Sequence, residues 1–184
     1  MGALVTPLGT VVRAAVAGAV GTLAMDAVLY RRYKRGGGTQ PFAEWEFSSG
    51  LTSWDGAPAP ALVGKRLYEG LFQRELAPRW AGVTNNVTHW GTGIAWGVQY
   101  GVAAASISSP RTRTFIASAL GPGVWGTSYV VLPLAKLYQP IWEYGMKTLA
   151  RDLSAHMAYG CATATVFRML GGERSAVAKQ AERA

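Results

Sequence analysis

Both histidines of this chain follow a polar residue by four positions. His89 follows Asn85, and His156 follows Asp152. Residues four apart lie on the same face of a helix, so each imidazole is predicted to have a polar neighbour one turn away. Imidazole changes its charge near neutral pH and is the commonest metal ligand. The spacing therefore predicts two polar sites suited to proton exchange or to metal binding.

Acidic residues accompany the histidines in both halves of the chain. Asp26 interrupts an apolar stretch, and Glu44, Glu46 and Glu143 follow in the loops. We expect these side chains to converge with the histidines at one membrane boundary. The complete predicted pocket contains Asp26, Glu44, Glu46, Asn85, His89, Glu143, Asp152 and His156.

Three kinds of role remain open for such a pocket. It relays protons or couples a solute, because ionisable residues at membrane depth are costly and are retained for function. Alternatively it binds zinc, iron or manganese through His89, His156 and Asp152, or a haem between the two imidazoles. In the third role the polar residues cap helices and hydrogen-bond across the structure. The chain has no His-Glu-x-x-His spacing and no catalytic triad order, so the motifs indicate no reaction class and leave open whether the protein is an enzyme, and we expect no resident cofactor unless the metal or haem interpretation holds.

Three short motifs occur twice in the same order. The first set is Gly18-Ala19-Val20-Gly21-Thr22, Gln40-Pro41-Phe42 and Asn85-x-x-x-His89-x-x-x-Gly93; the second is Gly123-Val124-Trp125-Gly126-Thr127, Gln139-Pro140-Ile141 and Asp152-x-x-x-His156-x-x-x-Gly160. Such internal similarity predicts two related helical hairpins within one domain of residues 1–184. Repeat 1 covers about 10–107 with an insertion at 36–82, repeat 2 covers about 114–171, and a polar tail follows at 172–184.

The composition favours a membrane protein. Hydrophobic residues make up 49% of the chain and charged residues 15%, against about a quarter in soluble domains. Four segments, 14–30, 87–107, 114–134 and 153–170, are nearly free of charge and approach the ~20 residues that span a bilayer. Tyrosine and tryptophan gather near their ends, as at membrane interfaces. We predict an all-α integral membrane four-helix bundle rather than a soluble protein with buried helices.

Small residues recur on the predicted spans at helical spacing. Gly93, Gly97 and Gly101 are four apart, and so are Ala14, Gly18 and Thr22. Such faces let helix backbones approach closely inside a membrane. The predicted packing glycines are Gly18, Gly21, Gly93, Gly97, Gly101, Gly123, Gly126 and Gly160.

The insertion at 36–82 is the largest part outside the spans. It opens with three glycines, and a proline-containing segment from Ala57 leads into a predicted helix that continues through Leu76. Leu67 and Leu71 lie on one face of that helix. We expect an amphipathic helix that lies on the membrane surface or caps the bundle.

The positive charges are unevenly distributed. The net charge is +8, with eleven Lys and Arg residues in the two large loops and seven on the other side of the spans. Positively charged loops stay in the cytoplasm, so both large loops are predicted inside and both termini outside. The basic residues flank apolar spans without a nucleic-acid-binding motif. Anionic lipid headgroups are therefore the expected partner, and nucleic acid is not.

Several motifs also resemble a known family. The chain combines Met25-Asp26 with a basic Tyr-Arg-Arg-Tyr-Lys-Arg exit, Asn-Asn-x-x-His-Trp at the second span, and Pro-Ile-Trp-Glu ahead of Asp-Leu-Ser-Ala-His. It is similar over residues 10–170 to uncharacterised actinobacterial membrane proteins. More remotely, from Val131 through His156, it resembles the YagU-like inner-membrane family, which is linked to acid tolerance. The first half departs from that family by its long insertion.

The resemblance implies a multi-pass protein of the bacterial inner membrane that contributes to proton or envelope homeostasis. An assembly role is the alternative, in which glycine faces bind another membrane subunit or a second copy of the chain. A metal- or haem-binding protein is the third possibility.

Overall fold

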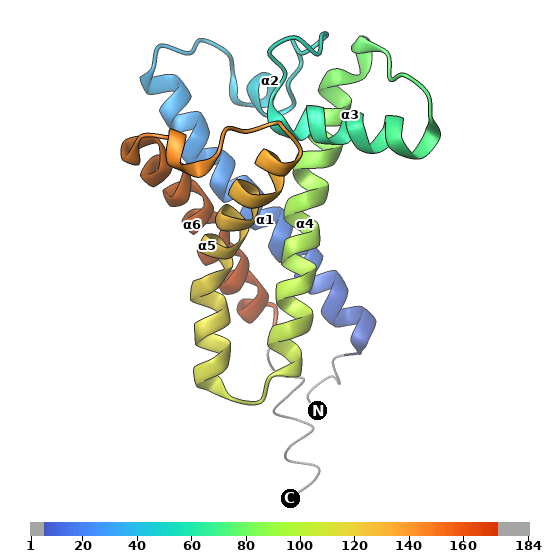
Figure 1. Cartoon of the computed structure of the whole chain (residues 1–184). Coiled ribbons are helices and arrows are strands. Elements are labelled where there is room, and N and C mark those ends of the chain that lie inside the picture. The colour runs from blue at the N-terminus through green and yellow to red at the C-terminus, as the bar shows by residue number, and fades with distance from the viewer. Residues whose placement is uncertain (1–5, 173–184) are drawn as a thin grey trace, which may run out of the picture.

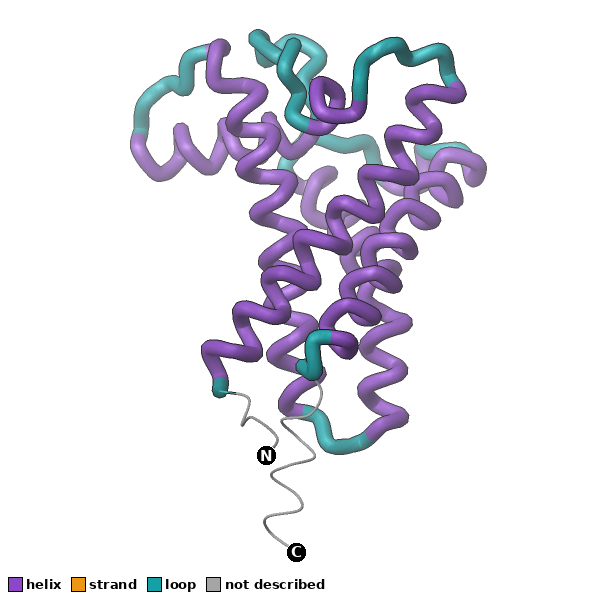
Figure 2. Tube along the Cα trace, turned by 180° about the vertical axis from the view of Figure 1, so that it is seen from behind, coloured by secondary structure: helices purple, strands orange, loops and turns teal. Residues whose placement is uncertain are grey.

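The computed structural model describes residues 6–172, and every regular element in that range is a helix (Figures 1 and 2). The long helices are α1 (Pro7–Arg35), α4 (Ala81–Ser106), α5 (Pro110–Leu134) and α6 (Met146–Met169). The short elements are α2 (Phe42–Glu46), α3 (Ala59–Phe72) and the 3-10 turns η1 (Pro78–Trp80) and η2 (Ile141–Glu143). The predicted all-α class is confirmed. The polar tail predicted at 172–184 lies, after Gly172, outside the described residues.

Two of the long helices are membrane-capable by length and composition. Helices α1 and α5 are long and apolar enough to cross a bilayer. Helices α4 and α6 are of similar length, but glycine, threonine and polar residues lower their hydropathy. The structure thus supports two of the four predicted spans, and the other two stay a prediction.

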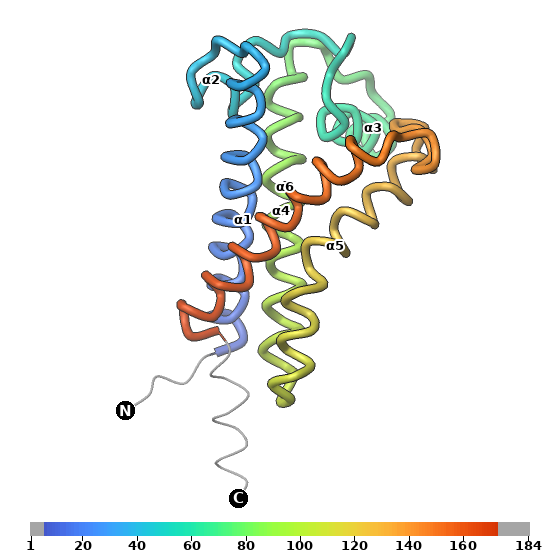
Figure 3. Tube along the Cα trace, turned by 90° about the vertical axis from the view of Figure 1, so that its left-hand side faces the viewer, coloured from blue at the N-terminus to red at the C-terminus, as the bar shows by residue number. Residues whose placement is uncertain are grey.

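Helix α1 packs on one side against α4 and on the other against α6 (Figure 3). Its contact with α4 consists of small residues. A Cβ atom on Gly18 would lie 2.8 Å from the carbonyl oxygen of Gly93, and one on Gly97 would lie 2.5 Å from the Cα of Gly18. The two small-residue faces predicted from the sequence therefore lie against each other, with the backbones in contact.

Helix α6 completes the core. Gly21 of α1 faces Tyr159 and Thr163 of α6, and the Tyr159 hydroxyl donates a 2.6 Å hydrogen bond to the carbonyl oxygen of Gly93. Tyr159 and Phe167 are the largest fully buried side chains, whereas most other buried positions hold alanine, glycine or threonine. The core is therefore built mainly from close backbone approach around two large aromatic rings.

Helix α5 packs against α6, and its path bends along its length (Figure 3). Two prolines lie inside this helix, Pro122 and Pro133, and a proline within a helix removes a backbone donor and favours a kink. The close approach is made by Gly121, whose Cβ would lie 2.6 Å from the carbonyl oxygen of His156. The predicted packing glycines Gly123 and Gly126 have no other element of residues 6–172 within 4 Å of a Cβ position. The α5 contact is thus displaced by two residues from the one that the repeated motif predicted.

The insertion covers one end of the long helices (Figure 1). Helix α3 lies across that end and packs on α4 through Ala61 and Gly64, where a Cβ on Gly64 would meet Thr84 and Thr88. The helix ends at Phe72, before the predicted Leu76, because Gln73 adopts a left-handed conformation with φ 52°. The insertion is therefore a helical cap whose residues reach the ends of α1 and α4.

Candidate functional site

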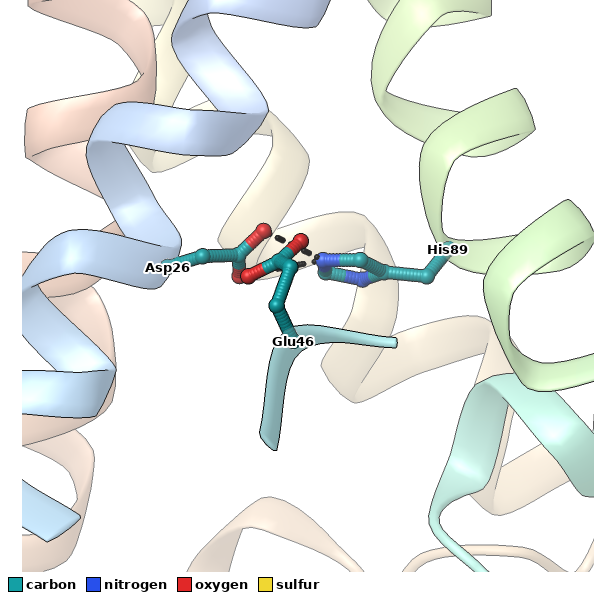
Figure 4. Close-up of side chains that lie close together, drawn as sticks. All are labelled: Asp26, Glu46 and His89. Atoms are coloured by element: carbon teal, nitrogen blue, oxygen red, sulfur yellow. Dashed lines mark hydrogen bonds and ion pairs between the residues drawn. The ribbon is translucent and has the colours of Figure 1, made fainter. Parts of the chain in front are cut away.

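Three of the predicted pocket residues meet beneath this cap. Asp26 comes from α1, Glu46 from α2 and His89 from α4, and one donor atom of each lies within 4.8 Å of the others (Figure 4). The Nε2 atom of His89 is 3.0 Å from Oδ1 and 2.9 Å from Oδ2 of Asp26. We call these three residues the Asp-Glu-His cluster.

The packing of α1 on α4 explains why Asp26 meets His89. The residues of α1 that face α4 are spaced four apart and begin at Ala14. The residues of α4 that face α1 are also spaced four apart and run from Gly101 toward the start of the helix. Four pairs face each other in order: Ala14 with Gly101, Gly18 with Gly97, Thr22 with Gly93, and Asp26 with His89. Spacing of four keeps each series on one helix face. The glycine contact therefore sets the register that brings the carboxylate to the imidazole.

Glu46 reaches the cluster because α2 is fastened at both ends. Before Glu46, the ring centroids of Phe42 and Trp45 lie 5.1 Å and 5.4 Å from the ring centroid of Tyr30 on α1. After Glu46, the chain is held by α4, as Asn86 Nδ2 donates a 2.7 Å hydrogen bond to the carbonyl oxygen of Phe47. We refer to residues 42–48 as the α2 strap.

Asn85 fastens the same strap. Its Nδ2 atom donates a 2.9 Å hydrogen bond to the Ser48 hydroxyl oxygen, so its amide group supports the α2 strap. The sequence patterns predict no role for Asn86 or for the aromatic side chains of the strap. The available signal was the aromatic pairs at a spacing of three, Tyr30 with Tyr33 and Phe42 with Trp45, which place two rings on one helix face.

The cluster holds two buried acidic groups and one imidazole. Asp26 is 3% exposed, Glu46 is 6% exposed, and the His89 side chain is 22% exposed. Within residues 6–172, neither carboxylate oxygen of Glu46 makes a hydrogen bond of good geometry, although the side chains of Asp26 and Trp90 lie close enough to affect its pKa. Within residues 6–172, no lysine or arginine forms an ion pair with Asp26 or Glu46. A protonated His89 would therefore neutralise only one of the two carboxylates.

Burial determines the protonation of Glu46. It raises the pKa of the Glu46 carboxyl from 4.5 to about 7, and the negative charge of Asp26 acts in the same direction. A buried carboxylate without a partner is costly because its ionised form loses hydration. The group therefore retains its proton up to neutral pH unless another cation takes the proton's place.

The other predicted pocket residues lie elsewhere. Glu44 and Glu143 are exposed. His156 turns to its own helix, with Nδ1 3.0 Å from the carbonyl oxygen of Asp152 and 3.6 Å from its Oδ1. The structure does not bring Glu44, Glu143, Asp152 or His156 into the cluster. Of the three predicted metal-ligand candidates, only His89 belongs to it.

No known family model, curated protein or solved structure matches this chain. Its function is therefore argued from the cluster and from the surface of the molecule.

Proposed function

We propose that this chain is a multi-pass protein of the bacterial cytoplasmic membrane that takes up a cation in the Asp-Glu-His cluster and thereby contributes to proton or envelope homeostasis. The observation that carries the proposal is the buried carboxylate of Glu46 beside Asp26, which makes no hydrogen bond of good geometry within the described residues. Two acidic groups share one imidazole there. When both carboxyl groups are ionised, a protonated His89 compensates only one of the two negative charges, so a bound cation would be stabilised.

The distribution of side-chain size supports a membrane environment. The contacts between α1, α4 and α6 are formed largely by glycine, alanine and threonine, while large aliphatic side chains point outward. The exposed ones on α1 are Leu8, Val11, Val12, Val16, Val20 and Leu23. In water these large side chains would stay exposed, because the contacts between the helices bury small residues instead of them. Lipid tails are an apolar environment that accommodates them, and small-residue contacts are typical of membrane helices.

The charge pattern supports an orientation with the cluster at the cytoplasmic boundary. The last turns of α1 carry Arg31, Arg32, Lys34 and Arg35, at the end of the molecule where the α2 strap lies. Clusters of positive charge beside a span favour the cytoplasmic side and attract anionic headgroups. In this orientation a cation would enter the cluster from the cytoplasm.

Helix α3 fits the same boundary. It lies across the end of the long helices and exposes Leu67, Leu71 and Phe72 (Figure 1). A helix with one apolar face and a flat position is typical of an interfacial helix. Its packing on α4 would hold the cap at headgroup level, directly beside the cluster.

A growth experiment tests whether the cluster carries the function. Cells that depend on this chain are grown at acidic pH and under limiting and excess divalent metal, with wild type, Asp26→Asn or Glu44→Gln as the only copy. We expect Asp26→Asn to behave like the deletion strain, because it removes the charge that faces His89 and Glu46. Glu44→Gln is the matched control, since it alters an exposed acid two residues from Glu46 and should behave like wild type.

Protein levels in the membrane fraction are measured for each strain. Growth of the Asp26→Asn strain equal to wild type, with the protein present at a normal level, would make the cluster a structural feature and remove the proposed function. Release of the wild-type chain by alkaline carbonate would contradict its insertion in the membrane.

An assembly role is the second candidate, and one observation favours it. Among the described residues, nothing outside the local helix lies within 4 Å of a Cβ position on Gly123 or Gly126 of α5 or on Gly91 of α4. Outward-facing glycine on a membrane helix permits close contact with another helix. In this role Gly123→Leu would abolish co-purification of a differently tagged copy or of another membrane subunit, with the cluster intact.

A further inference from the structure

We infer that the Asp-Glu-His cluster is a binding site for one divalent transition-metal ion of the zinc, iron or manganese class. The inference deepens the proposed function and rests on it, because it names the cation. Asp26, Glu46 and His89 would each supply one ligand, from α1, α2 and α4 respectively.

The donor types define the class of metal. Two carboxylates and one imidazole form a mixed oxygen and nitrogen set, which suits zinc, iron and manganese. Calcium and magnesium prefer oxygen ligands alone. Soft ions such as copper(I) prefer thiolate or thioether ligands, and the group contains neither.

The distances are compatible with a shared ion. Metal-to-ligand bonds of ~2.0–2.2 Å to nitrogen and oxygen place neighbouring donor atoms roughly 3–4 Å apart. The Asp26 and His89 donors are already 2.9 Å apart, and all three donors lie within 4.8 Å of one another. Three elements thus present their donor atoms to one small volume (Figure 4).

Glu46 supplies an independent reason to expect a ligand. Asp26 and His89 satisfy one another by direct contact, so this pair needs nothing more. Glu46 is nevertheless held beside them, 94% buried, and within the described residues neither of its oxygens makes a hydrogen bond of good geometry, with only the Asp26 carboxylate and the Trp90 indole near it. A buried polar group without a partner requires an explanation such as an absent ion. Two aromatic contacts and two amide hydrogen bonds fix the α2 strap and hold this carboxylate in place.

Three protein ligands would leave part of the coordination sphere open. Structural zinc sites are closed by four protein ligands, whereas sites that exchange water or act on a substrate retain an open position. The geometry therefore points to an exchangeable ion rather than to one that holds the fold together.

Metal content of the purified protein tests the inference. The full chain is produced without a polyhistidine tag, purified in detergent and measured by inductively coupled plasma mass spectrometry. The variants are Asp26→Asn, Glu46→Gln and His89→Gln, with Glu44→Gln and His156→Gln as matched controls outside the cluster. Each protein is then stripped with a chelator and titrated with cobalt(II), whose visible spectrum reports ligation by protein side chains.

We expect a stoichiometric ion, or a cobalt(II) spectrum, in wild type and both controls, with at least a roughly tenfold loss of affinity in the three cluster variants. Thermal unfolding of each stripped protein shows whether the variant is folded. Glu46→Gln is decisive, because α2 is a short segment outside the packing of α1 on α4 and its substitution should leave the fold intact.

Two results would overturn the inference. In the first, wild type contains no metal and binds no cobalt(II). In the second, all five variants bind metal equally, which places the ion elsewhere. If Asp26→Asn nevertheless fails in the growth experiment, the cluster handles a cation other than a metal and the proposed function stands. If the growth phenotype is also absent, the proposed function falls with the inference.

Discussion

Glu46 is the residue whose position conflicts most with ordinary packing rules. Its carboxyl group lies beside Asp26 in a buried place, and the negative charge of Asp26 opposes the ionisation of Glu46. A chain selected for stability alone would place glutamine or an apolar residue at this position, because an unpartnered buried carboxylate is costly. Violations of local rules of this kind are expected at functional sites. Glu46 is therefore the best single probe of the cluster.

Replacing Glu46 by glutamine should change the pH dependence of stability. Below pH 4.5 the wild-type carboxyl is protonated in both the folded and the unfolded state and contributes nothing. Between pH 4.5 and about 7 the unfolded state ionises first, so the stability of wild type falls as pH rises. We expect Glu46→Gln to equal wild type at pH 4 and to be more stable by about 1–3 kcal/mol at pH 8.

Thermal unfolding of metal-free protein in detergent, recorded from pH 4 to pH 8, measures this difference. Glu44→Gln is the control, because the same change is made at an exposed position of the same segment. A Glu46→Gln curve that runs parallel to wild type over the whole range would show that Glu46 does not titrate in that window.

At the scale of elements, the contact of α1 with α4 determines where the cluster forms. The facing pairs continue from Ala14 with Gly101 to Asp26 with His89, so the cluster is the polar end of a small-residue seam. We expect a change of helix separation within the seam to reach Asp26 and His89, because both helices are continuous through these turns.

Gly97→Ala should weaken the seam, whereas Gly91→Ala should not. A Cβ on Gly97 would lie 2.5 Å from the Cα of Gly18 and 2.9 Å from the carbonyl oxygen of Ala14, and backbone cannot turn aside. We expect a loss of about 1–3 kcal/mol. On the same helix Gly91 has open space, so alanine there should stabilise by about 0.5–1 kcal/mol. Thermal unfolding of the two variants in detergent compares them, and equal stability would contradict the close contact.

The sequence predicted the long helices and the two small-residue faces of the seam, because charge-free length and a spacing of four are local patterns, but it did not predict that these two faces pair with each other. It did not predict which face of α5 contacts α6. The repeated motif pairs Gly18 with Gly123, but Gly121 makes the contact in the structure. If Gly121 corresponds to Gly18, the position that corresponds to Asp26 is Tyr129. The second half therefore offers its histidine no carboxylate from the neighbouring helix, and His156 contacts Asp152 of its own helix.

Glu46 illustrates the other limit of sequence-based prediction. Its residue type and loop position made it a candidate, equal in this respect to Glu44. Only the α2 strap distinguishes them, since contacts with Tyr30 and Asn86 fix the turn of α2 and direct one glutamate inward. Such contacts join residues that are distant in sequence. The aromatic spacing of three marks the faces that take part, but it does not indicate that these faces meet each other.

At the scale of the whole molecule, the large apolar side chains lie mostly on the surface, whereas the contacts between helices are formed mostly by small residues. Large aliphatic and aromatic side chains such as Leu8, Phe115, Leu134 and Met169 are exposed, while the seams are glycine and alanine. A soluble protein of this size would bury its largest apolar side chains first, because burial of their surface drives folding in water. The arrangement is consistent with a solvent of lipid around the long helices and of water around the cap.

Cys161 provides a direct test of this surface, because it is the only cysteine and lies exposed on α6. If α6 is in the membrane, a charged, membrane-impermeant maleimide should fail to label Cys161 in sealed vesicles of either orientation. The reagent should label it after the membrane is dissolved in sodium dodecyl sulfate.

Thr39→Cys in a Cys161→Ser background is the matched control, since Thr39 is exposed in the loop before α2. It should be labelled in inside-out vesicles and protected in right-side-out ones, if the cap is cytoplasmic. Labelling of Cys161 as fast as Thr39→Cys in intact vesicles would place α6 in water. Because α6 packs against α1 and α5, that result would also contradict a bundle surrounded by lipid.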